Sequence, residues 1–163
     1  MTTTMDARKD LTTLAGNFFL NDSLASDFRI GAVTNNPAPG VVWDDVDAER
    51  RLALDITTPG KLLPWARIQV RHVTERQATL GNVNGKIRWR RGGILHVQVF
   101  VPRGMGLRTL DPLVQGLIAA MRGRRTTNGV VVRNARLSEL GPAGASPWFA
   151  ATVVSEFEYD QIE

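Results

Sequence analysis

Positively charged side chains recur at alternate positions in one short stretch of the chain, where they are well placed to bind another molecule. If the stretch is a β-strand, Lys86, Arg88 and Arg90 share one face about 7 Å apart, while Ile87 and Trp89 face the other way. Such a row is tolerated on a solvated edge strand, or where it meets phosphate or carboxylate groups. The row is therefore a candidate contact for a polyanion or an acidic protein surface.

A complementary row of carboxylates lies near the end of the sequence. In a strand, Glu156 and Glu158 share one face, Phe157 and Tyr159 share the other, and Asp160 follows. A carboxylate row on one strand and a cation row on another are electrostatically complementary. The two rows can pair within one subunit or between neighbouring subunits.

Charge is segregated along the 163 residues, whose formal net charge is +4. Residues 82–136 hold 11 basic side chains and one acidic side chain, whereas residues 137–163 hold 5 acidic side chains and no basic one. The middle segment also contains the remaining basic candidates, Arg91, Arg122, Arg124 and Arg125. A basic middle beside an acidic tail indicates either a polyanionic partner or mutual neutralisation between subunits.

Other residue types that support catalysis or cofactor binding are scarce. Without cysteine there is no disulfide, thiolate metal site or thiol nucleophile. His72 and His96 each fall in a strand pattern, where a packed histidine is more frequent than a ligand, and the acidic run at 44–47 lacks the glycine and glutamate of an EF-hand. The turn at 104–106 lacks the third glycine of a dinucleotide-binding motif, and Ser146 lacks the following glycine of a nucleophile elbow. We therefore predict no enzyme activity, no metal and no cofactor.

Hydrophobic periodicity predicts the helices that position these residues. An apolar stripe predicts a first helix over about residues 6–29, whose end lies either at Asn21-Asp22 or near Gly31. A stronger stripe predicts a second helix over residues 107–121. Asp111-Pro112 fits the start of the second helix, and Gly123 fits its end.

Alternating or continuous apolar runs predict the strands. They fall at residues 41–43, 65–74, 86–90, 94–101, 130–137 and 148–159. The glycines in Arg91-Gly92-Gly93 allow a bend or a bulge, and the last two strands form a hairpin. The segment 44–64 is a long loop, which leaves residues 65–160 as the core of sheet and helix.

These elements assign the chain to the α+β class, as one domain over residues 1–163. We expect a mixed, mainly antiparallel sheet packed by the N-terminal helix and the central amphipathic helix. No run of 18 apolar residues occurs, and the N-terminus lacks the apolar core of a signal peptide. We therefore expect a protein made in the cytoplasm that does not contact a membrane.

The order of elements from residue 86 onward resembles one protein family. The matching features are, in order, a basic strand, Val97-Gln98-Val99-Phe100, Pro102, Gly104-Met105-Gly106, an apolar helix, Gly129-Val130 and an aromatic-rich last strand ending at Phe157-Glu158-Tyr159-Asp160. This order is similar to that of the tail terminator proteins of long-tailed, non-contractile phages and related phage-derived particles. The likeness covers residues 86–160, the first helix and residues 41–46 also fit, and residues 47–64 depart from the family.

The resemblance implies a small subunit that closes into a homohexameric ring. The ring would cap the finished tail tube, end tail polymerisation and offer a surface for head–tail joining. Its partners would be other copies of itself, the tail tube protein and the head-completion protein of the neck, with non-specific contact to DNA in the lumen. It would be assembled in the host cytoplasm and reside in the tail and neck of the virion.

The resemblance also implies roles for the charged candidates. The seven basic candidates would lie at subunit contacts or line the lumen of the ring, and the three carboxylates Glu156, Glu158 and Asp160 would be their acidic complement. The family supplies no catalytic residues.

Two other functions fit the same residues. One is another ring of the head–tail neck, such as a head-completion or stopper protein, which only its position in a particle distinguishes. The other is a small DNA-binding module, for which salt-dependent affinity would be the signature. That module would use Lys86, Arg88, Arg90, Arg91, Arg122, Arg124 and Arg125.

Overall fold

Two helices and five strands make up the described part of the chain. The computed structural model describes residues 2–24, 41–43, 64–79, 86–105, 107–143 and 147–162. The elements are α1 (Thr4–Asn21), β1 (Val41–Trp43), β2 (Trp65–Gln77), β3 (Arg88–Pro102), the 3-10 turn η2 (Arg103–Met105), α3 (Leu107–Met121), β4 (Val131–Pro142) and β5 (Trp148–Ile162).

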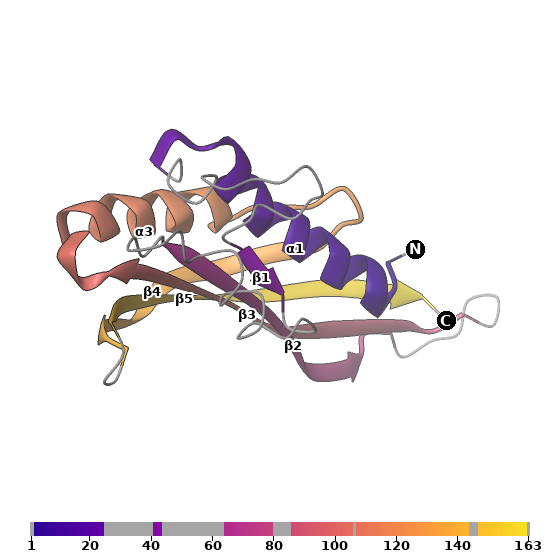
Figure 1. Ribbon diagram of the computed structural model, residues 1–163. Coiled ribbons are helices and arrows are strands. Elements are labelled where there is room, and N and C mark those ends of the chain that lie inside the picture. The colour runs from indigo at the N-terminus through magenta and orange to yellow at the C-terminus, as the bar shows by residue number, and fades with distance from the viewer. Residues whose placement is uncertain are drawn as a thin grey trace.

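The strands form one sheet in the order β1-β2-β3-β5-β4. β1 pairs with β2 in parallel, and the pairs β2–β3, β3–β5 and β4–β5 are antiparallel. Both helices lie on the same face of the sheet, α1 over the β2 side and α3 over β4 and β5 (Figure 1). The expected α+β fold, with its mixed and mainly antiparallel sheet, is confirmed.

The core lies between the helices and the sheet. Alternate residues of each strand point into it, as Ala66, Ile68 and Val70 do from β2, and all three are buried. The largest fully buried side chains are Phe19, Leu11, Ile68, Leu95, Leu110, Leu113, Leu117 and Met121. Because the core residues of β2, β3, β4, β5 and both helices are mainly apolar, their burial supplies the main stabilisation of the fold.

The first helix has clear local signals at both ends. The Thr3 side chain accepts a hydrogen bond from the Asp6 backbone N–H, and the Asp6 carboxylate accepts one from the Thr3 N–H, which is a reciprocal capping box. The chain turns extended at Asp22, whose carboxylate accepts from the Leu24 N–H. Of the two predicted ends, Asn21-Asp22 is confirmed, and the longer range 6–29 was wrong, since the helix stops at Asn21.

The second helix, α3, spans the predicted range 107–121, but Asp111-Pro112 does not mark its start. Pro112 lies inside α3 rather than in its first turn. A proline there forfeits one backbone hydrogen bond, which full burial of Leu110 in the preceding turn offsets. Gly123 ends the helix as expected, with φ of 70°.

The predicted bend at Gly92 and Gly93 is absent from β3, which pairs with β5 without interruption. The irregularity lies opposite, in β2, between His72 and Thr74. A Cβ atom on Gly93 would lie 2.0 Å from the Arg71 carbonyl oxygen. The glycine therefore permits a close approach of the bulged neighbouring strand.

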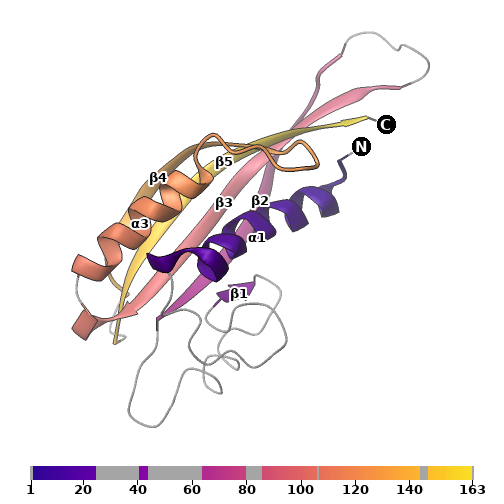
Figure 2. The ribbon, with the colours of Figure 1, turned by 90° about the horizontal axis from the view of Figure 1, so that it is seen from above.

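The outer strands differ in length and regularity. β1 has three residues, whereas β4 has twelve and its register with β5 shifts between Arg133 and Arg136 and again between Leu137 and Glu139. Asn134, within the first shift, has a positive φ of 51°. The long strands β2 and β3 project past both helices at the end of the molecule where α1 begins and β5 ends (Figure 2).

Candidate interaction surface

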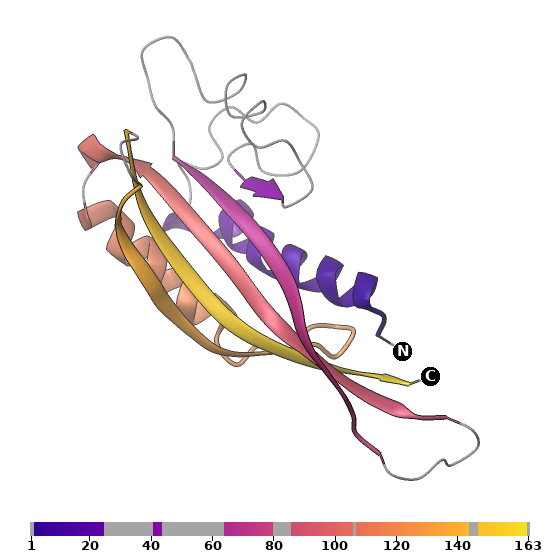
Figure 3. The ribbon, with the colours of Figure 1, turned by 90° about the horizontal axis from the view of Figure 1, so that it is seen from below.

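The face of the sheet opposite the helices is the candidate surface. Within the described ranges, no helix lies on this face, and β2, β3, β5 and β4 cross it side by side (Figure 3). We call it the open face. It receives the residues that alternate with the core positions, so its chemistry changes along the strands from aromatic through polar to charged.

Three aromatic rings occupy one end of the open face. Trp65 of β2 stacks on Phe100 of β3 with ring centroids 3.9 Å apart, and Trp148 of β5 contacts Trp65 edge-on at 6.3 Å. All three rings are half-buried, and the Trp65 Nε1 atom is buried with no hydrogen-bond partner among the described residues. We call these residues the aromatic triad. Partly exposed tryptophan and phenylalanine rings are typical of protein interfaces.

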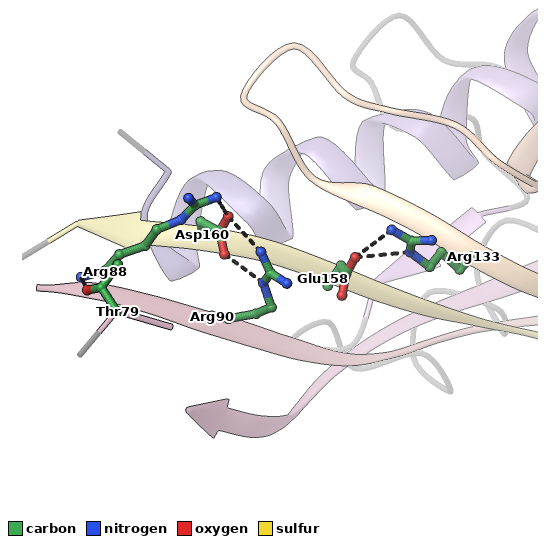
Figure 4. A network of polar contacts seen from close by, with 6 residues as sticks. All are labelled: Thr79, Arg88, Arg90, Arg133, Glu158 and Asp160. Carbon is green, nitrogen blue, oxygen red and sulfur yellow. Dashed lines mark hydrogen bonds and ion pairs between the residues drawn. The ribbon is translucent and has the colours of Figure 1, made fainter. Parts of the chain in front are cut away.

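Guanidinium and carboxylate groups occupy the other end. Arg90 donates from Nε to Asp160 Oδ1 at 2.9 Å and from Nη2 to Oδ2 at 3.3 Å, and Arg88 also pairs with Asp160 (Figure 4). The hydrogen bond from Arg90 is the main cause that lowers the pKa of Asp160, and the same bond raises the pKa of Arg90. Two cations of the predicted row therefore share one carboxylate within the subunit.

The other two predicted carboxylates also find partners within the chain. Arg133 of β4 donates from Nη2 to Glu158 Oε1 at 2.7 Å (Figure 4). Glu156 accepts from Asn134 Nδ2 at 2.8 Å and from Arg136 Nη1 at 3.4 Å, and the bond from Asn134 is the main cause that lowers its pKa. Of the two pairings that the sequence left open, the structure contains the one within the subunit.

Arg91 belongs to the opposite face, although we had grouped it with the cation row. Because Arg91 is one residue out of step with Arg90, its side chain points beneath α1. There it donates to Thr4 Oγ1 at 3.0 Å, to Gln161 Oε1 at 2.7 Å and to Glu75 Oε1 at 2.9 Å. Arg91 thus fixes the start of α1 to β2 and β5.

A histidine and a tyrosine lie next to this contact. The Tyr159 hydroxyl donates to Thr4 Oγ1 at 3.2 Å and lies 3.4 Å from His72 Nδ1. Burial is the largest cause that lowers the pKa of His72, and the charges of Arg8 and Arg91 act in the same direction. His72 is therefore packed in the fold, as its strand position predicts.

The remaining basic candidates are dispersed. Arg122 donates to the Ala135 carbonyl at 2.9 Å, Arg124 donates to the Ala120 carbonyl at 3.1 Å, and Arg125 forms a backbone bridge with Val131. These three residues shape the connection from α3 to β4. Lys86 is exposed just before β3. The seven basic candidates therefore do not form one patch.

Trp89 also differs from expectation. Its position opposite the cations predicts contact with a core or a neighbour, yet the ring is only half-buried and lies outside the main core cluster. It sits on the projecting part of β3, paired with Gln77 and Gln161 rather than with apolar residues.

Sequence reasoning missed the aromatic triad and one arginine, Arg76. Trp65 falls in the predicted strand 65–74, but an alternating pattern does not show which face the helices leave bare. Arg76 lies beyond the predicted end of that strand, which continues to Gln77. A signal was present in the spacing of Trp65, Arg67, Gln69 and Arg71, which share the face opposite the core.

Several candidates lie outside the described residues. These are the acidic run at 44–47, Gly106, Ser146 and all but the last residue of the loop 44–64. Among the residues that are described, no group of three or more His, Asp or Glu side chains could hold a metal ion. No helix in the described ranges is long and apolar enough to cross a membrane.

The comparisons with known proteins assign the chain to no family. No protein-family model and no curated protein matches the chain. One solved structure that is similar, whose name describes no function, is 16% identical, with a TM-score of 0.49 over 92% of this chain and 94% of that chain.

Proposed function

We propose that the protein is a structural subunit of a ring that caps a phage tail tube, a tail terminator. The observation that carries the proposal is the open face, where the aromatic triad lies half-exposed with no described helix over it. A half-exposed group of aromatic rings on one face is typical of a surface that packs against another protein. The family resemblance over residues 86–160 supports the same proposal.

A closed ring needs two different lateral surfaces on each subunit, because its contacts are heterologous. The molecule offers such a difference. The outer side of α1 presents exposed residues such as Met5 and Leu20, which are 80% and 38% exposed, whereas the open face presents aromatic and charged side chains. One surface of each kind allows each copy to contact two neighbours in a closed ring.

Ion pairs within the subunit fix several side chains at the charged end of the open face. Because Arg88 and Arg90 pair with Asp160, and Arg133 pairs with Glu158, these guanidinium groups are held in fixed positions. The same pairs weigh against a DNA-binding module, since phosphate groups would have to compete with carboxylates already in contact. In the proposed ring the partners are other copies of the chain, the tail tube protein and the head-completion protein.

Oligomer mass and electron microscopy test the proposal. We expect the purified protein to form a ring of countable subunits in negative stain, with a matching mass by light scattering. Trp148→Ala should weaken ring formation, whereas Leu107→Ala, an exposed leucine on α3, is the matched control for loss of apolar surface. Circular dichroism establishes that both variants are folded.

Measurement of tube length distinguishes a tail terminator from another ring protein of the neck. Addition of the protein to polymerising tail tube protein from the same particle should limit tube length, and particles that lack it should carry tubes of irregular length. A protein that stays monomeric at all concentrations, or that leaves tube length unchanged, contradicts the proposal.

A further inference from the structure

A hollow of about 470 Å³ lies at the charged end of the open face, next to the bulge of β2. Its walls come from four strands and include Val73, Arg76, Arg90, Ile94, Arg133 and Glu158. The volume is within the range of pockets that bind small molecules or single side chains. We infer that this hollow is a docking site for an acidic peptide segment of a partner protein.

Positive charge is in excess around the hollow. Arg76 of β2 lies directly opposite Arg90 of β3, which places two like charges in neighbouring cross-strand positions. Arg90 is held by Asp160, and Arg133 is held by Glu158. Arg76 is exposed and forms no ion pair with the described residues, so it is available for an anion.

One wall of the hollow is apolar. The bulge of β2 leaves Val73 62% exposed, and Ile94 lies half-buried nearby in the same lining. An occupant that covers this wall must carry an apolar group as well as a negative charge. A peptide with alternating acidic and aliphatic residues meets both requirements, because a carboxylate can accept from Arg76 while an aliphatic side chain covers Val73.

The apolar wall favours a peptide over nucleic acid. The phosphate backbone of a DNA duplex would contact the arginines but would leave Val73 without an apolar partner. Because the hollow has one apolar wall, we assign its occupant to a segment of a protein. This inference does not depend on ring formation, since the hollow is built from strands of one subunit.

Fluorescence polarisation with a defined probe tests the site. The probe is a labelled decapeptide of alternating aspartate and leucine, and the matched neutral probe has asparagine in place of aspartate. We expect the acidic probe to bind more tightly than the neutral probe. Arg76→Ala should weaken binding of the acidic probe about tenfold, the usual effect of losing a hydrogen bond to a charged group. Arg108→Ala removes an exposed arginine from α3 and should leave binding unchanged.

Two further variants and one competitor complete the test. Val73→Ser should weaken binding of the acidic probe by less than Arg76→Ala does. Thermal unfolding establishes that each variant is folded. Equal affinity for both probes, or no effect of Arg76→Ala in a folded protein, would overturn the inference. Tighter binding of a twelve-base-pair DNA duplex that displaces the peptide would also overturn it. If Arg76→Glu abolishes self-association, the occupant is a second copy, and the assignment to a separate partner is wrong.

Discussion

The two faces of the sheet are built from alternate residues of the same strands, yet they differ in almost every property. On β3, Leu95, Val97 and Val99 are fully buried beneath the helices, whereas His96 and Gln98 lie half-buried between them on the open face. The covered face is mainly apolar, with one polar cluster at the start of α1 where Arg91, Tyr159 and Thr4 meet, and the open face changes from aromatic to charged. The comparison indicates that stability resides mainly on the covered face, which leaves the open face for the contacts proposed above.

Truncation of a covered residue should have the largest effect. Leu117 of α3 is fully buried, and we expect Leu117→Ala to lower the free energy of unfolding by about 3 kcal/mol. Leu140 is 43% exposed and borders the open face, so Leu140→Ala should cost less than about 1 kcal/mol. Urea denaturation measures both values. Equal losses would show that the two faces share stability evenly.

A methyl group at Gly93 should be the next most damaging change. The added Cβ would lie 2.0 Å from the Arg71 carbonyl oxygen and 2.7 Å from the Phe157 ring, so backbone must move. We expect Gly93→Ala to cost about 2 kcal/mol in urea denaturation. Gly141→Ala on β4 is the control, because no atom lies within 4 Å of its added Cβ. A stable Gly93→Ala protein would show that the bulge of β2 does not need this close approach.

Lowering the pH should destabilise the fold through His72, which lies on the covered face. His72 has a pKa below its ordinary value of 6.5, so the folded state binds fewer protons than the unfolded state as pH falls through 6.5. Stability should therefore decrease as pH is lowered through this range. His72→Gln should make the free energy of unfolding depend less on pH between pH 8 and pH 5, which lie about 1.5 units on either side of the ordinary histidine pKa. An unchanged slope in the variant would assign the dependence to other groups.

The smallest effect should come from an ion pair on the open face. Asp160 has a pKa below its ordinary value of 3.8, so its stabilising contribution is present above 3.8 and is lost as pH falls through the lower, folded-state value. Asp160→Asn should reduce stability at neutral pH by less than about 1 kcal/mol, because the pair is partly solvated. Glu139→Gln, an exposed carboxylate on β4, is the control. A difference that persists in acid would contradict the ion-pair explanation.

The sequence predicts the elements better than their boundaries. Apolar periodicity locates the helix over 107–121 because that stripe is what the fold buries. It does not choose between the two predicted ends of α1, and the extended backbone at Asp22 shows that the earlier end is correct. It also assigned the bulge to the glycines of β3, whereas those glycines accommodate a bulge in the facing strand.

The candidate surface was predictable only in part. The complementary rows were visible in the sequence, and Arg90 and Asp160 do meet. Which cations meet which carboxylates depends on strand register, and Arg91 falls on the other face because it is one residue out of step with Arg90. The hollow could not be predicted, since it depends on the bulge that exposes Val73.

The irregular outer strand has a consequence for crowded solutions. Unpaired backbone groups along a regular outer strand recruit strands from other molecules, which leads to fibrous aggregates. In β4 the two register shifts and the left-handed Asn134 interrupt that row, and β1 offers only three residues on the opposite side of the sheet. In the described residues, neither border of the sheet is therefore a long, regular template on which strands of other copies could add.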